Sequence, residues 1–198
     1  MISSKWFKDL FFNIPKEEPQ QMLISQKYPN LNLTIDKKGF DFIKNWEKFE
    51  SKPYKCPAGK MTIGFGHVIL DKETFDLEGI SLSKAEELLR VDIAKRTHWT
   101  NSNITKPLTQ NQFNALISIA FNSTNDGDLI KVAPTAIGFL NLGEYDKAAI
   151  ELFSKEKGLV FITTKDKATG ERRKSLVQGL VNRRKAEWDM WNDRVFVS

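Results

Sequence analysis

The chain has 198 residues, of which 40% are hydrophobic, 11% aromatic and 28% charged, and its formal net charge is +5. This is the composition of a folded globular protein, because disordered chains lack the aromatic and branched side chains that offset chain entropy. One cysteine excludes an internal disulfide and a thiolate-based zinc site, and two histidines exclude a site of three imidazoles. The positive charge favours anionic partners without choosing among them.

Residues 1–33 are expected to form an N-terminal appendage. A short amphipathic stretch at 5–14 is followed by the polar, proline-broken run 15–21. The apolar stretch is about half as long as a membrane-spanning helix, and charges interrupt it. Because it also lacks a small-residue cleavage site, we expect no signal peptide. A helix docked on the main body is one interpretation of residues 5–14, and contact with a membrane surface is the other.

The main body is expected to cover residues 34–198. A helix is predicted over 36–50, where apolar side chains recur at i, i+1, i+4 and i+7, and Pro53 should end it. Residues 53–70 contain a turn sequence at 56–59 and then alternate apolar with small side chains, so a small antiparallel sheet is expected there.

Most of the remaining chain is predicted to be helical. Capping boxes at 83–86 and 109–112 mark the starts of two helices, and residues 113–121 carry the apolar stripe of a core helix. Further helices are predicted from Pro134, over 145–153 and over 180–191. The pattern as a whole predicts an α+β fold.

Residues 159–175 break the helical pattern and predict a hairpin or a long loop. Between residues 165 and 185 the chain carries eight basic and two acidic side chains, a local charge of +6. This run is either a solvated basic face or a surface that attracts an anionic polymer.

The most informative stretch runs from Glu47 to His67 and reads EKFESKPYKCPAGKMTIGFGH. Eight residues separate Glu47 from Cys56, and five separate Cys56 from Thr62. The stretch resembles the phage-type lysozymes, the endolysin family of the T4-like and lambdoid phages. Their pattern is a glutamate, eight residues, an aspartate or cysteine, five residues, and a threonine in Thr-Ile-Gly-aromatic-Gly-His. The chain is similar to the cysteine-bearing branch.

This resemblance extends over roughly residues 35–191, with 159–175 as a probable insertion. It implies a lysozyme-like α+β fold in which a cleft for the glycan strand lies between a small sheet lobe and a larger helical lobe. It also implies a muramidase that hydrolyses the β-1,4 bond between N-acetylmuramic acid and N-acetylglucosamine in peptidoglycan, without cofactor or metal. A monomer is expected, with no nucleic-acid partner, held in the host cytoplasm until a holin-type route releases it to the wall.

Cleavage of a glycosidic bond requires a proton for the leaving oxygen and stabilisation of, or attack on, an oxocarbenium-like centre. Glu47 is the expected acid, because it lies at the edge of the apolar helix stripe, and partial burial favours a protonated carboxyl. Glu50 is a competitor, but only five residues separate it from Cys56. Thr62 is expected to position the attacking water, since a hydroxyl both donates and accepts.

Cys56 has three interpretations. It can help Thr62 to orient a water, form a covalent thioglycoside, or be a small buried side chain under the hairpin. A free thiol has a pKa of about 8.5, so it cannot simply replace a carboxylate at neutral pH.

Four more residues are expected at the site, as substrate-binding or supporting groups. Arg183 is expected to pair with Glu47 across the cleft, and His67 to make a structural hydrogen bond or ion pair. Tyr54 and Asn122 complete the set. The alternative function is a non-catalytic or membrane-active wall-binding protein on a lysozyme scaffold, against which the complete spacing of the catalytic residues argues.

Overall fold

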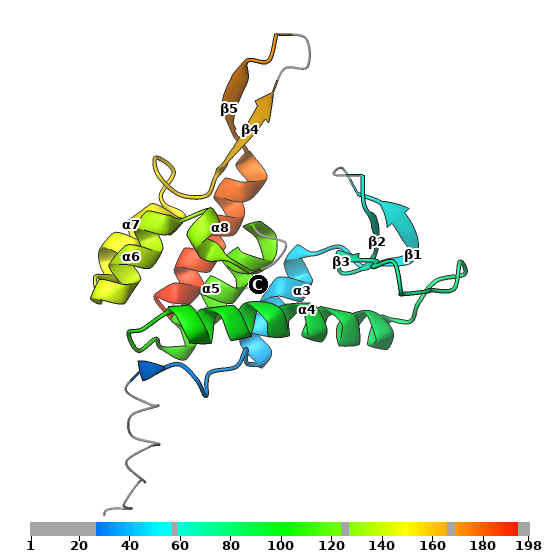
Figure 1. The fold of residues 1–198 in the computed structure, drawn as a ribbon, viewed down its shortest axis with the longest axis horizontal. Helices are drawn as coiled ribbons and strands as arrows, with labels where there is room; N and C mark the ends of the chain where they lie inside the picture. The colour runs from blue at the N-terminus through cyan, green and yellow to red at the C-terminus, as the bar shows by residue number, and fades with distance from the viewer. Residues whose placement is uncertain (1–26, 57–58, 124–126, 166–168, 194–198) are drawn as a thin grey trace, which may run out of the picture.

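The computed structural model describes residues 27–56, 59–123, 127–165 and 169–193. Figure 1 shows a small sheet on one side of the molecule, a group of helices on the other, and α4 running beneath both. The sheet is antiparallel with strand order β1-β2-β3, and its strands are β1 (Glu50–Lys55), β2 (Met61–Gly64) and β3 (His67–Val68). The predicted α+β fold with a small sheet lobe and a larger helical lobe is confirmed.

The helices follow the predicted order along the chain. They are α3 (Lys37–Trp46), α4 (Leu82–Asn103), α5 (Gln110–Ser123), the short 3-10 helix η1 (Leu129–Lys131), α6 (Pro134–Leu142), α7 (Tyr145–Phe153) and α8 (Gln178–Trp191). α5 is the central helix, with an unbroken run of buried residues at 113–120. It packs against α3, α4 and α8, which explains why it is buried on all sides. Within the described residues, no helix is both long and apolar enough to cross a bilayer.

The first helix ends earlier than predicted. α3 begins after Asp36, whose side chain accepts a hydrogen bond from the Gly39 amide, and it ends at Trp46 instead of continuing to residue 50. Strand pairing overrides the helical periodicity here, because Glu50 already pairs with Gly64 in the sheet. Pro53 therefore does not end the helix. It lies in the edge strand β1, beside a register irregularity, where a residue without an amide proton is tolerated.

One of the two predicted capping boxes is wrong. α4 is capped by Ser81, whose hydroxyl accepts from the Lys84 amide, so Ser83 lies inside the helix. The other box is confirmed. Thr109 Oγ1 accepts from the Gln112 amide at 3.2 Å, and Gln112 Oε1 accepts from the Thr109 amide at 2.9 Å.

The segment before α3 packs on the helical lobe. Asn30 is buried, and its Nδ2 donates to the carbonyls of Ile104 and Lys106 while its Oδ1 accepts from the Leu108 amide. Asn101 Nδ2 donates to the carbonyl of Leu33. Residues 1–26, which include the helix expected at 5–14, lie outside the described part of the chain.

The predicted break between α7 and α8 is a hairpin. Its strands are β4 (Phe161–Lys165) and β5 (Arg172–Leu176), which pair antiparallel from Phe161 with Leu176 to Lys165 with Arg172. Figure 1 shows this hairpin projecting away from the helices. At its base the Val177 amide donates to the Val160 carbonyl.

Gly39 is the point of closest approach between α3 and α5. A Cβ atom at this position would lie 2.6 Å from Asn114 Cγ and 2.8 Å from Ile35 Cγ1. Asn114 is fully buried, and its Nδ2 donates to the Asp36 carboxylate that caps α3. We therefore expect Gly39→Ala to lower the free energy of unfolding by about 1–3 kcal/mol, as overpacking does, although alanine favours helices. Urea denaturation measures this change.

The matched control is Gly138→Ala, in α6, where a Cβ would have no neighbour within 4 Å. This variant should be neutral or more stable by up to about 1 kcal/mol. Equal effects of the two substitutions would contradict the close packing of α3 against α5.

Candidate active site

Glu47 lies where α3 ends and the chain turns toward the sheet. Its backbone is extended, with φ −92° and ψ 132°, and its amide donates to the Ile43 carbonyl. Its side chain is 23% exposed, and Oε1 accepts a hydrogen bond of 2.7 Å from Nη1 of Arg183 on α8. Within the described part of the chain, Oε2 makes no hydrogen bond. One carboxyl oxygen is thus fixed, and the other remains available.

Arg183 is held from behind by buried polar groups. Its side chain is 5% exposed, its Nε donates to Glu187 Oε1 at 3.3 Å and its Nη2 to Ser118 Oγ at 3.4 Å. Ser118 Oγ in turn donates to Glu187 Oε1 at 2.6 Å. The guanidinium that meets Glu47 is therefore fixed by contacts from both α5 and α8.

Arg184 belongs to the same buried network. It is fully buried, and its Nη2 donates to Glu187 Oε1 at 2.8 Å and to Asn122 Oδ1 at 3.2 Å. Burial lowers the pKa of this guanidinium, and the charge of Glu187 opposes that shift. Two arginines and the two carboxylates of Glu47 and Glu187 balance in formal charge, as burial of ionic groups requires.

Of the two other predicted catalytic residues, Thr62 lies in β2 and Cys56 directly follows β1. Tyr54 and Thr62 are directly opposite in the β1-β2 register, so their side chains share one face. Thr62 is 3% exposed, and its Oγ1 donates to the Lys60 carbonyl at 3.1 Å. The Cys56 amide donates to the same carbonyl at 2.9 Å. Lys60 therefore joins Cys56 and Thr62 through its backbone.

Tyr54 links this sheet face to the end of α3. Partial burial raises the pKa of the Tyr54 phenol, and the nearby Glu50, Cys56 and Glu47 raise it further. Glu47 ends α3 three residues before β1, which contains Tyr54, and Tyr54 pairs with Thr62 of β2.

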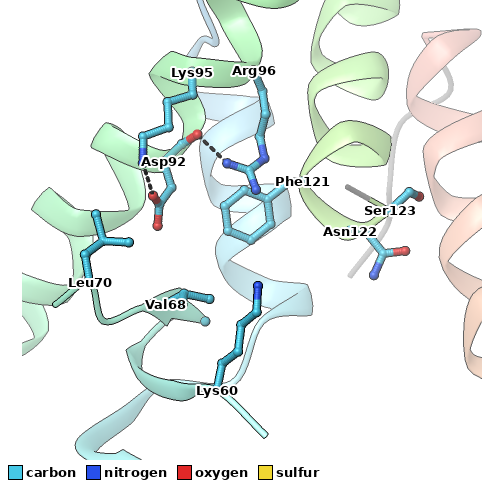
Figure 2. Close-up of a pocket in the computed structure, with 10 residues that line it drawn as sticks. Lys60, Val68, Leu70, Asp92, Lys95, Arg96, Phe121, Asn122 and Ser123 are labelled. Atoms are coloured by element: carbon cyan, nitrogen blue, oxygen red, sulfur yellow. Dashed lines mark hydrogen bonds and ion pairs between the residues drawn. The ribbon is translucent and has the colours of Figure 1, made fainter. Parts of the chain in front are cut away.

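A cavity of about 330 Å³ lies between the two lobes. As Figure 2 shows, one wall comes from the sheet lobe and the other from α4 and the end of α5. The lining residues are Lys60, Gly66, Val68, Leu70, Asp92, Lys95, Arg96, Phe121, Asn122 and Ser123. Glu47, Cys56 and Thr62 are not among them. They adjoin the cavity through Lys60 on the sheet side and through Asn122 and the arginine network on the helical side.

His67 lies on the opposite face of the sheet from Thr62 and is buried. Its Nδ1 is 2.8 Å from Asp92 Oδ2, and its Nε2 is 3.0 Å from Glu73 Oε2. The hydrogen bond to Asp92 raises the pKa of His67, with a further contribution from Glu73 and against the effect of burial. His67 therefore joins the sheet lobe to α4 and is not part of the cavity wall.

Comparison with known proteins identifies the family. The family model described as phage lysozyme matches residues 44–187, a range that contains Glu47, Cys56, Thr62 and Arg183. The chain belongs to the phage lysozyme family. It is therefore a glycoside hydrolase of the lysozyme type, a muramidase whose substrate is peptidoglycan.

Individual relatives agree with this membership. An endolysin of Acyrthosiphon pisum secondary endosymbiont phage 1 is 36% identical over 156 residues, which cover 77% of this chain and 94% of the relative. An endolysin of Bacillus phage B103 is 35% identical over 133 residues, 65% of this chain but only 49% of that protein. Among solved structures, an endolysin from Escherichia coli O157:H7 phage FAHEc1 superposes with a TM-score of 0.66 at 29% identity, covering 84% of this chain and 98% of its own.

Sequence reasoning missed several polar residues of this phage lysozyme. Glu187 and Arg184 lie at i, i+3 spacing on α8, and this spacing could have indicated their ion pair. Ser118 and Asp92 carry no local signal, because only the packing of α5 and α4 places them. The basic run from residue 165 to 185 is not one solvated face, since Arg183 and Arg184 are buried.

Across the described ranges, no group of three or more His, Cys, Asp or Glu side chains is arranged to hold a metal ion.

The His67 cluster predicts a pH dependence of stability. The raised pKa of His67 gives stabilisation that is complete below about pH 6.5 and is lost as the pH rises through the folded-state value. Burial would raise the pKa of Asp92, but hydrogen bonding and charge from His67 and charge from Lys95 lower it below its usual range. The pKa of Glu73 is lowered by the Leu70 amide and then by His67. The carboxylate contributions are therefore lost as the pH falls below about 4.5.

We expect His67→Gln to lower the free energy of unfolding by about 1–3 kcal/mol at pH 5.5, because charge-assisted hydrogen bonds are removed. The difference from the unsubstituted protein should shrink at pH 9. Urea titrations of both proteins at the two pH values measure it. A difference that does not change with pH would contradict the ionised cluster.

Proposed function

We propose that Glu47 is the catalytic acid of this muramidase. Its carboxyl would protonate the glycosidic oxygen between N-acetylmuramic acid and N-acetylglucosamine as the bond breaks. The observation that carries this proposal is the asymmetric hold on the side chain, in which Arg183 binds Oε1 and Oε2 is left without a partner in the described structure. The oxygen that must carry and release the proton is the one that remains available.

Arg183 is proposed as a positioning residue. Its guanidinium is buried and has three fixed hydrogen-bond partners, so it holds the carboxyl in one orientation. Of the two carboxyl oxygens, Arg183 contacts Oε1, at 2.7 Å.

Thr62 is proposed to position the attacking water. Because its Oγ1 hydrogen-bonds through its only proton to the Lys60 carbonyl, the oxygen lone pairs remain to accept a hydrogen bond from water. The hydroxyl is nearly buried on the sheet face next to Tyr54, so a water bound there would be ordered. Attack by this water on the face of the sugar opposite Glu47 gives inversion; its surplus proton leaves to solvent, and solvent reprotonates Glu47 after the leaving oxygen has taken its proton.

Cys56 is proposed to assist Thr62 in placing the water and not to act as a nucleophile. Its amide donates to the same Lys60 carbonyl that accepts from the Thr62 hydroxyl, and this supports a shared role. A direct attack would require the thiolate, which is the minor form of an ordinary thiol at neutral pH. This is the role that the aspartate or cysteine of the family pattern can share.

The wider biological assignment is also a proposal. We propose a monomeric enzyme that causes cell-wall lysis, as the endolysin names of its relatives suggest, and that reaches the wall from the host cytoplasm by a holin-type route. Contact of residues 5–14 with a membrane surface remains a prediction, since these residues lie outside the described structure.

Glu47→Gln should abolish lysis, with a loss of at least about 10³-fold in turnover, because the amide cannot donate the proton. The appearance of new reducing ends from purified peptidoglycan measures this, and circular dichroism tests the fold. Glu50→Gln is the matched control, because Glu50 is an exposed carboxylate three residues away. It should retain turnover within about threefold. Retained turnover in Glu47→Gln would reject the assignment.

Substitutions at the sheet separate the two roles proposed there. Thr62→Val, which keeps the shape but removes the hydroxyl, should lower kcat more than tenfold, since a general-base or water-orienting group contributes about 10²-fold or more. Cys56→Ser should retain at least about a tenth of the activity. Loss of all turnover in Cys56→Ser, with a covalent adduct seen by mass spectrometry in the parent enzyme, would instead favour the thioglycoside. The anomer released, followed by NMR, tests inversion.

A further inference from the structure

The β4-β5 hairpin has exposed side chains along its length. All five residues of β5 are exposed, and Ile162 of β4 is 46% exposed. A two-stranded ribbon is only marginally stable in water by itself, so its retention on the surface calls for a function or a partner. Its base is anchored by the Val177 amide on the Val160 carbonyl and by Lys174, which packs over the Phe161 ring at 4.2 Å.

The hairpin is strongly basic. Its described residues, 161–165 and 169–176, include four basic residues and one acidic residue. The acidic residue, Glu171, forms an exposed ion pair of 3.1 Å with Arg173, and such pairs contribute little to folding. Arg183 and Arg184 are buried in the network behind Glu47. The basic residues of the hairpin therefore form much of the exposed part of the basic run at residues 165–185.

The hairpin is attached directly to the helix that carries the active-site arginine. It ends at Leu176, and α8 begins at Gln178. Arg183 lies six residues beyond Val177, a rise of about 9 Å along the helix. Since Arg183 binds Glu47, the base of the hairpin is within about two helical turns of the active site. A long polymer bound at Glu47 can therefore reach the hairpin.

We propose that the β4-β5 hairpin is a second peptidoglycan contact, which binds the carboxylates of stem peptides on the strand whose glycan occupies the active site. This inference rests on the proposed function, because it takes the same polymer as its ligand. Stem peptides project from the muramic acid residues and carry free carboxylates. Arginine guanidinium groups bind carboxylates with paired hydrogen bonds, and β5 presents Arg172 and Lys174 on one face of the ribbon and Arg173 on the other.

The residue distribution disfavours two other anionic ligands. A membrane-inserting hairpin needs apolar side chains at its tip, but residues 165–173 read KDKATGERR and contain no large apolar residue. The apolar residues Phe161, Ile162 and Leu176 lie at the base instead. Single-stranded nucleic acid is bound by exposed aromatic rings, whereas the Phe161 ring is covered by Lys174.

The test compares binding to purified, insoluble sacculi in a Glu47→Gln background, so that the polymer stays intact. The triple variant Arg172→Gln, Arg173→Gln and Lys174→Gln removes three positive charges from β5. We expect its affinity for sacculi to fall about tenfold at low salt, with the difference closing at high salt because exposed charges are screened. The control triple Lys27→Gln, Lys72→Gln and Lys106→Gln removes the same charge from exposed positions elsewhere and should bind within about twofold of the background.

A second arm tests the ligand. Sacculi whose carboxylates have been converted to neutral amides should bind the background protein as weakly as native sacculi bind the hairpin variant. Arg172→Lys and Arg173→Lys, which keep the charge but lose the paired hydrogen bonds, should bind with an affinity between those of the background protein and the glutamine variant. Circular dichroism and thermal melting confirm that each variant is folded.

Three results would overturn the proposal. They are equal losses in the two triple variants, unchanged affinity of the background protein for amidated sacculi, or a hairpin variant that keeps its sacculus affinity while losing binding to phosphatidylglycerol vesicles or to DNA. Failure of the proposed catalytic function has a different signature. If Glu47 is not the catalytic acid, the Glu47→Gln protein releases new reducing ends, with or without the hairpin substitutions.

Discussion

The ion pair between Arg183 and Glu47 is the contact on which the arrangement of the site depends. It joins residues 136 positions apart in sequence, one at the end of α3 and the other on α8. Burying an arginine is costly unless its hydrogen bonds are satisfied, and Ser118 and Glu187 supply the missing partners. The central helix α5 therefore does more than fill the core, because Ser118 on it helps to fix the guanidinium that binds the Glu47 carboxyl.

The sheet lobe is organised around a backbone group. The Lys60 carbonyl accepts from both the Cys56 amide and the Thr62 hydroxyl, so one backbone group holds the Cys56 main chain and the Thr62 side chain. Five residues separate Cys56 from Thr62, and among them Gly59 has a φ of +82°, which favours glycine at a turn. The fixed spacing between Cys56 and Thr62 is thus a consequence of the hairpin, and the spacing between Glu47 and Cys56 reflects the path from α3 into β1.

Local patterns in the sequence predicted much of this molecule, and the failures have physical causes. The Thr109 capping box, Pro134 at a helix start and the small sheet all depend on neighbouring residues, so they could be predicted locally. The end of α3 could not, because pairing of Glu50 with Gly64 decides it. The same holds at the site. The motif placed Glu47, Cys56 and Thr62, whereas Ser118 and Asp92 are recruited by tertiary packing that no local spacing indicates.

Asp92 serves two structures at once. One of its oxygens binds His67 and so joins the lobes, while the residue also lines the cavity together with Lys95. A substitution of Asp92 therefore alters both the shape of the cavity and the connection between the two lobes. A substitution that widened the cavity at Asp92 would also lower thermostability. The same cost would restrict which substitutions can accumulate in this wall during evolution.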